Sequence, residues 1–163
     1  MAVSVTYAAT CTVRETLATN TGSASDSSRV ITHDAYNESA TLSATSTPPA
    51  TTCAHFLLTL SGGAATIDLR ALTGTNGATV DLNGLKVQVV RVKNLGANSM
   101  VFKVGASNGH TGIFSATNGQ TVQPSGHVQI FSNDAGDDVD ATHKTWDVAG
   151  TGSQTAEVTI VAG

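Results

Sequence analysis

The chain carries few charges and contains no long hydrophobic run. Only 12% of its 163 residues are Asp, Glu, Lys or Arg, and the formal net charge is −4. The chain therefore offers no basic surface for nucleic acid or for an anionic membrane, and we expect neither partner. No apolar run approaches the roughly 18 residues of a membrane-spanning helix, which predicts a soluble protein.

Signals for secretion and for disulfide bonding are also scarce. The opening MAVSVTYAAT has neither a basic segment nor a sustained apolar segment, so we expect no secretory signal peptide. The only cysteines are Cys11 and Cys53, too few for a disulfide framework. A single bridge between them stays open, but we expect two free, buried thiols.

The histidines show no metal-binding spacing. None of the five lies in a His-x-His or His-x-x-x-His arrangement: His33, His55, His110, His127 and His143. We expect them on the surface or at subunit contacts. Convergence of the last three on a metal ion, as in β-sandwich metalloenzymes of the cupin type, is the alternative.

An acidic loop from Asn133 to Asp140 contains oxygen ligands of the kind that Ca²⁺ prefers. It carries Asp134, Asp137, Asp138 and Asp140, but not with EF-hand spacing. We expect a solvated turn. The G-x-S-x-G frame of a nucleophilic serine and the glycine-rich phosphate-binding motif are missing too. We therefore predict no enzyme, and no catalytic, cofactor-binding or metal-binding residue.

Turn signals are abundant. Four Asn-Gly pairs lie close together, at Asn76-Gly77, Asn83-Gly84, Asn108-Gly109 and Asn118-Gly119. Asn and Gly tolerate the positive φ angles that a type I′ turn needs at both central positions. The pairs therefore predict tight hairpins between antiparallel strands.

Alternation of apolar and polar residues predicts the strands themselves. It recurs through roughly eight to ten segments from Phe56 to Ile160, whereas no helical period is sustained, so we predict an all-β, jelly-roll-like antiparallel β-sandwich. The inward phase slips at Val89-Val90, which indicates a β-bulge, or a long strand that is covered first on one face and later on the other.

The first part of the chain differs from the rest. Residues 1–28 contain few large apolar side chains, and we interpret them as an extended N-terminal arm or peripheral hairpin, with ordinary edge strands as the alternative. Residues 29–163 are assigned to the sandwich domain. The phenylalanines and Trp146 follow apolar alternations and are expected in the core, which leaves Tyr36 as the one aromatic platform for a sugar.

Three stretches from Ser39 onwards share one character: SATLSATSTPPAT leading into HFLLTLSGGAATIDL, then DLNGLKVQVVRVKNLGANSMVFKV, and a lone Trp followed by TAEVTIVAG. In these stretches the chain resembles small all-β structural proteins of tailed-bacteriophage virions. The chain and these proteins are alike in residue composition and in the order of their strands, and they share no diagnostic motif. The long, weakly patterned first part departs from this resemblance.

The resemblance implies a non-enzymatic capsid decoration, cement or head-fibre protein. Such a protein would be made in the host cytoplasm, carried on the virion exterior and assembled as a homotrimer. Its partners would be the major capsid protein or other virion proteins, and it would need no cofactor. The alternative is a receptor- or carbohydrate-binding module of a fibre or cell surface.

Overall fold

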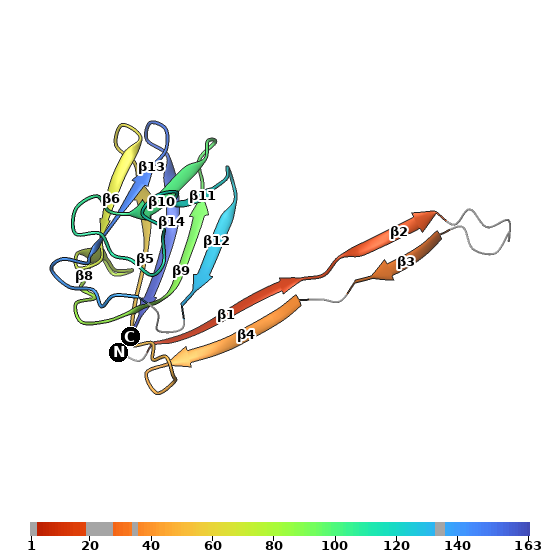
Figure 1. The fold of residues 1–163 in the computed structure, drawn as a ribbon, viewed down its shortest axis with the longest axis horizontal. Coiled ribbons are helices and arrows are strands. Elements are labelled where there is room, and N and C mark those ends of the chain that lie inside the picture. The colour runs from red at the N-terminus through yellow and green to blue at the C-terminus, as the bar shows by residue number, and fades with distance from the viewer. Residues whose placement is uncertain (1–2, 19–27, 34–35, 133–135) are drawn as a thin grey trace. The chain divides into compact units, whose positions relative to one another are not determined.

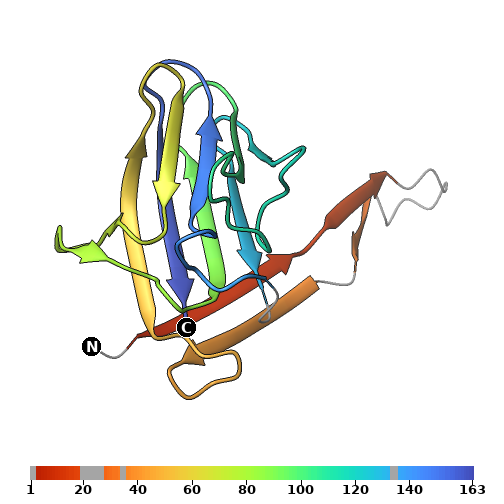
Figure 2. The same cartoon turned by 60° about the vertical axis from the view of Figure 1, so that its left-hand side comes forward.

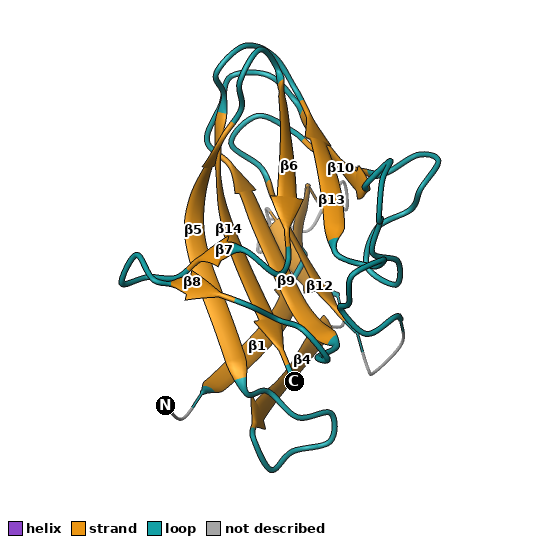
Figure 3. Ribbon diagram, turned by 90° about the vertical axis from the view of Figure 1, so that its left-hand side faces the viewer, coloured by secondary structure: helices purple, strands orange, loops and turns teal. Residues whose placement is uncertain are grey.

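The computed structural model describes residues 3–18, 28–33, 36–132 and 136–163, with the main chain alone for 16–18 and 28–31. The described part contains strands and no helix, so no helix there could cross a membrane (Figure 3). It forms two compact units, one of Met1–Val5 with Leu42–Gly163 and one of Thr6–Thr41. The all-β prediction is confirmed.

The larger unit is built from two four-stranded antiparallel sheets that pack against each other (Figures 1 and 2). One sheet has the order β12-β9-β14-β5 and the other β11-β10-β13-β6. The strands of the first are β5 (Thr52–Thr59), β9 (Val87–Asn94), β12 (His127–Phe131) and β14 (Thr155–Ala162); those of the second are β6 (Ala64–Asp68), β10 (Met100–Val104), β11 (Gln120–Val122) and β13 (Thr145–Ala149). The predicted sandwich is confirmed.

The strand pairs are nested in the sequence. β5 pairs with β14, and inside that interval β6 pairs with β13, β9 with β12 and β10 with β11. The two sheets therefore form when one long antiparallel ribbon folds over on itself, with β9–β14 and β10–β13 closing it side to side. A short hairpin of β7 (Leu72–Thr73) and β8 (Thr79–Val80) lies outside the two sheets.

The core lies between the sheets and uses the apolar half of each alternation. Its largest fully buried side chains include Trp146, Phe102, Leu60, Leu69 and Met100. Trp146 and Phe102 were predicted to lie there because each alternates with polar neighbours. Removing such large apolar surfaces from water is the main stabilising contribution to a fold of this kind, at about 25 cal/mol per Å².

The predicted irregularity in the strand after residue 85 is confirmed. Val161 pairs with Val89 but Ala162 pairs with Val87, so Gln88 of β9 has no paired residue in β14. This is a β-bulge, and it reverses the facing of the side chains that follow it. Four consecutive residues, 87–90, are buried, whereas a regular surface strand would bury every second one.

The type I′ turns predicted at the Asn-Gly pairs are not found. Positive φ occurs at the glycine alone in three pairs and at Asn108 alone in the fourth, and a type I′ turn requires it at both positions. Only Asn76-Gly77 lies at the tip of a hairpin, between β7 and β8. The other pairs sit in turns of longer connections, where a single left-handed residue is enough to reverse the chain.

The smaller unit is a two-stranded ribbon that contains β2 (Arg14–Ala18), β3 (Ser28–Thr32) and most of β1 (Ser4–Cys11) and β4 (Tyr36–Ser43). β1 is hydrogen-bonded to β4, and β2 pairs with β3 in antiparallel register. The sequence predicted that the N-terminal arm ends at residue 28, but the ribbon extends further. β3 and β4 pair with the preceding strands β2 and β1 and with no strand of the sandwich.

Candidate functional site

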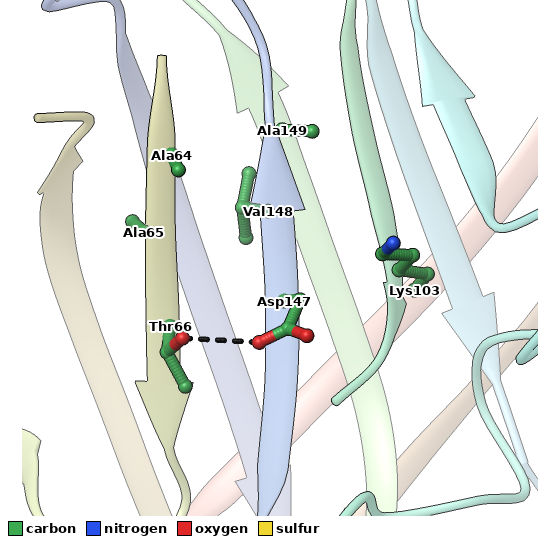
Figure 4. A pocket seen from close by; sticks show the side chains of 7 residues that line it. All are labelled: Ala64, Ala65, Thr66, Lys103, Asp147, Val148 and Ala149. Carbon is green, nitrogen blue, oxygen red and sulfur yellow. Dashed lines mark hydrogen bonds between the residues drawn. The ribbon is translucent and has the colours of Figure 1, made fainter. Parts of the chain in front are cut away.

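A hollow lies on the sheet that contains β6, β10 and β13. It has a volume of about 350 Å³. Its lining comes from these three strands, as Figure 4 shows: Ala64, Ala65, Thr66, Lys103, Asp147, Val148 and Ala149. Lys103 and Asp147 are paired in the register of the β10–β13 ladder, so their side chains leave the same face of the sheet.

The carboxylate of this hollow is held by two hydrogen bonds. Thr66 Oγ1 donates to Asp147 Oδ1 at 3.0 Å, and the main-chain N–H of Ala106 donates to Oδ2 at 2.8 Å. The lining contains no Ser, Cys or His. Its polar side chains are those of Thr66, Lys103 and Asp147, so the hollow is suited to contact with a polar group.

A second cluster of polar side chains lies where the connection after β10 meets the loop before β13. His110 is almost completely buried and donates from Nε2 to the main-chain oxygen of Asp137 at 2.9 Å. His143 Nε2 lies 4.0 Å from Asp137 Oδ2, and its Nδ1 lies 3.3 Å from Asp140 Oδ1. Two histidines and two aspartates are thus brought together, and we call these four residues the His–Asp cluster.

The protonation states in the His–Asp cluster follow from burial and hydrogen bonding. Burial lowers the pKa of His110, because a charged imidazole would lose its hydration. A hydrogen bond from Thr111 lowers the pKa of Asp137. The pKa of Asp140 is also lowered, first by the main-chain N–H and then by the side chain of Thr142. At neutral pH the two aspartates carry negative charge and His110 is uncharged.

This cluster is organised as a turn. Asp140 Oδ1 accepts from the main-chain N–H groups of Thr142 and His143, at 2.6 and 2.7 Å. Trp146 Nε1 donates to the main-chain oxygen of His110 at 3.1 Å, which ties the loop to the core. Among the described side chains, no three His, Cys, Asp or Glu residues are placed to hold a metal ion.

The sequence-based expectations for these residues have mixed outcomes. His110 was expected at the surface, but it is buried against Trp146, with ring centroids 5.8 Å apart. His127 is exposed on β12 and does not join the His–Asp cluster, so the last three histidines do not converge. Asp134 lies outside the described residues, and Asp138 Oδ1 is 3.6 Å from Lys86 Nζ.

The cysteines are free, as expected, but the prediction that they are buried is wrong. Both Cys11 and Cys53 are exposed. Cys53 belongs to the outward-facing half of the β5 alternation, whereas Ala54 points into the core. Partial burial nevertheless raises the pKa of the Cys53 thiol.

The ribbon of the smaller unit exposes both of its faces. Every residue from 8 to 15 is exposed, and so is every residue from 36 to 39. Consecutive side chains of a strand point to opposite faces, so neither face of these segments is covered. Tyr36 is 55% exposed, as predicted for a platform, and its hydroxyl donates to Glu38 Oε2.

The sequence reading did not identify the hollow beside Asp147. The signal was present in part, since Lys103 interrupts one apolar alternation and Asp147 another, which places both on outward faces. Their adjacency depends on the register of β10 against β13, which no local pattern reveals. Comparison of the chain with protein-family models, curated proteins and solved structures finds no match to any of them.

Proposed function

We propose that the chain is a non-enzymatic structural protein of a tailed-bacteriophage virion. In this role it binds the capsid exterior and stabilises the particle, as a decoration or cement protein, in a homotrimeric form. The observation that carries the proposal is the ribbon of the smaller unit, whose described segments 8–15 and 36–39 are exposed on both faces.

An isolated two-stranded ribbon is marginally stable in water because it has no core of its own. A ribbon of this kind gains stability when it lies on another protein, where apolar contact contributes about 25 cal/mol per Å², less the cost of ordering. A specific interface of standard size buries roughly 1,600 Å² in total. A protein whose role is to join neighbouring subunits would benefit from such an arm.

The jelly-roll topology is part of the same proposal. Its support is the nested pairing of four strand pairs, from β5–β14 outermost to β10–β11 innermost, which is the pattern expected when a long hairpin wraps into two sheets. A jelly roll suits a subunit that presents broad sheet faces and short connections to its neighbours.

The test is binding to particles. Capsids of the source phage that lack the protein should retain the purified chain on co-sedimentation, and their melting temperature should rise. Amide hydrogens of the ribbon should exchange fast in the isolated monomer and slowly in the assembly on the particle. Retention in the supernatant, or equal exchange in both states, would overturn the proposal.

One observation favours a second candidate, a carbohydrate-binding module. Tyr36 is 55% exposed and carries the carboxylate of Glu38 at its hydroxyl, so an aromatic face stands next to a hydrogen-bond acceptor. Selective signals on a glycan array that disappear in Tyr36→Ala would favour this function. Loss of capsid retention in the same variant, with a blank array, would favour the virion role.

A further inference from the structure

Strand β5 leaves one edge of its sheet open. It is the last strand in the order β12-β9-β14-β5, and no described strand forms a ladder with its outer side. Leu60, which directly follows β5, donates its main-chain N–H to Gln154 O at 2.9 Å, in the same register as the β5–β14 ladder. Because hydrogen bonding alternates along an antiparallel strand, the main-chain groups of Cys53, His55, Leu57 and Thr59 face the open edge.

This edge lacks most of the usual protection against pairing with another chain, although the β7–β8 hairpin approaches part of β5. Natural proteins protect edge strands with charged residues, prolines, bulges or short length. β5 is eight residues long, TCAHFLLT, and contains no Pro and no Asp, Glu, Lys or Arg. Leu57 is 60% exposed, which makes it the most exposed of the large apolar side chains described.

The other edges are less available. β11 has three residues, and β6 has five. At the ends of β6, the main chain of Ala64 is engaged with Ser61, and the oxygen of Asp68 accepts from Ala71 N–H at 3.0 Å. β12, the remaining edge strand of the two sheets, has five residues. Of the four edges, β5 offers by far the longest run of open main-chain groups.

A groove of about 200 Å³ runs beside the open edge, between β5 and β6. Phe56, Leu58, Ile67 and Leu72 supply its apolar lining, and the β7 end of the short hairpin borders it. A strand added to β5 would lie over this groove. It would cover apolar side chains in addition to making main-chain hydrogen bonds, the combination used in strand addition.

The ribbon of the smaller unit contains a strand with matching properties. β1 is also eight residues long, SVTYAATC, and is likewise free of charged residues and of Pro. One of its edges is hydrogen-bonded to β4, and its other edge has no ladder partner among the described strands. Residues Ala8 to Cys11 are exposed without interruption. Neither strand carries a charge that would repel the other.

We propose that β1 of a second copy of this chain adds to β5 in antiparallel direction. The sheet then continues as β12-β9-β14-β5 followed by β1 and β4 of the neighbour. Each copy has both the arm and the acceptor edge, so the contact is heterologous, and three copies can close a ring. This inference rests on the proposed role of the ribbon as a contact arm.

The antiparallel direction has a chemical consequence. Cys11 ends β1 and Cys53 is the second residue of β5, so antiparallel docking brings the C-terminal end of one strand beside the N-terminal end of the other. Both thiols are exposed. A contact between copies should therefore place Cys11 of one copy near Cys53 of the next.

The first test is self-association of the purified full chain without any particle. Sedimentation velocity should show an oligomer for the wild type and a monomer for Leu57→Lys, because a charge at the open edge opposes strand addition. Leu95→Lys is the matched control, since Leu95 is also an exposed leucine, at 43%, outside β5. It should associate like the wild type. Near-ultraviolet circular dichroism should show the same fold in all three.

The second test uses the native thiols. A short bismaleimide should cross-link the wild type between copies, and both Cys11→Ser and Cys53→Ser should abolish the product. Cross-linking that survives Cys11→Ser would mean that two β5 edges meet each other, and it would overturn the proposal. So would a wild type that stays monomeric, or an oligomer unchanged by Leu57→Lys.

Failure of the strand addition and failure of the proposed function give different outcomes. An oligomer that fails to bind capsids would refute the virion role and leave the strand addition standing. A monomer that binds capsids would refute the strand addition and the homotrimeric form, and leave the capsid-binding role standing.

Discussion

The connection between β10 and β11 has little regular structure, and Phe114 should be the residue that anchors it. Phe114 is only 6% exposed. Its ring centroid lies 4.9 Å from that of Trp146, at an interplanar angle of 81°, and 6.0 Å from that of Phe102. The aromatic trio therefore joins this connection to the inner faces of β10 and β13.

The expected cost of removing the ring can be estimated from these contacts. Replacing a buried phenylalanine by alanine usually costs about 3 to 5 kcal/mol, through lost transfer free energy and the cavity left behind. Phe114→Leu keeps most of the apolar volume but loses both ring pairs, at about 0.5 to 1.5 kcal/mol each. It should cost about 1 to 3 kcal/mol. Domains of this size have a free energy of unfolding of about 5 to 15 kcal/mol, so both variants should still fold.

The assay is urea unfolding followed by far-ultraviolet circular dichroism and by the fluorescence of Trp146, the only tryptophan in the chain. The control is Leu95→Ala, which should change the free energy of unfolding by less than about 0.5 kcal/mol because Leu95 is exposed. A loss below about 1 kcal/mol for Phe114→Ala, or equal losses for the Ala and Leu variants, would refute the reasoning.

Three further predictions concern titration and thiol chemistry. Burial lowers the pKa of His110 below its ordinary value of 6.5, so the free energy of unfolding should fall as the pH drops below about 6.5 and level off under the folded-state pKa. Denaturation between pH 5 and 8, above the range in which the aspartates titrate, should show this slope in the wild type and not in His110→Gln. Asp140→Ala should lower the melting temperature, because two main-chain N–H groups lose their acceptor; a calorimetric scan that matches the wild type would contradict this. Cys11 should react faster with Ellman's reagent at pH 7.5 than Cys53, whose pKa is raised, and single serine variants assign the two phases; the opposite order would contradict the burial argument.

Local patterns in the sequence were sufficient to predict most strands of the sandwich. Alternation predicted that Phe102 and Trp146 point inward, and the slip at Val89-Val90 predicted the irregularity beside Gln88. These features depend on neighbours along one strand, so they can be read from a short window.

Features that depend on pairing between distant strands could not be predicted. The approach of His110, Asp137 and His143 requires that the β10 connection and the loop before β13 meet at one end of the sandwich. The adjacency of Lys103 and Asp147 likewise follows from one register of β10 against β13. A shift of that register by a single residue would place the two charges on opposite faces of the sheet.

The Asn-Gly pairs show how a local signal can be correct in part. The glycines at positions 77, 84 and 119 do adopt positive φ, so the pairs mark reversals of the chain. Their turn type and their partners were decided by the connections in which they lie. Asn118-Gly119 ends a long connection, although β10 and β11 on either side do pair.

The position of β14 has a consequence for biosynthesis. This strand lies in the middle of its sheet, with β5 on one side and β9 on the other, and its pairing partners were synthesised long before it. While the ribosome is still translating residues 155–162, β5 and β9 cannot be bridged. Folding of the sandwich should therefore be completed only after the last of these residues has left the exit tunnel, and until then the nascent chain exposes strand edges that a chaperone could occupy.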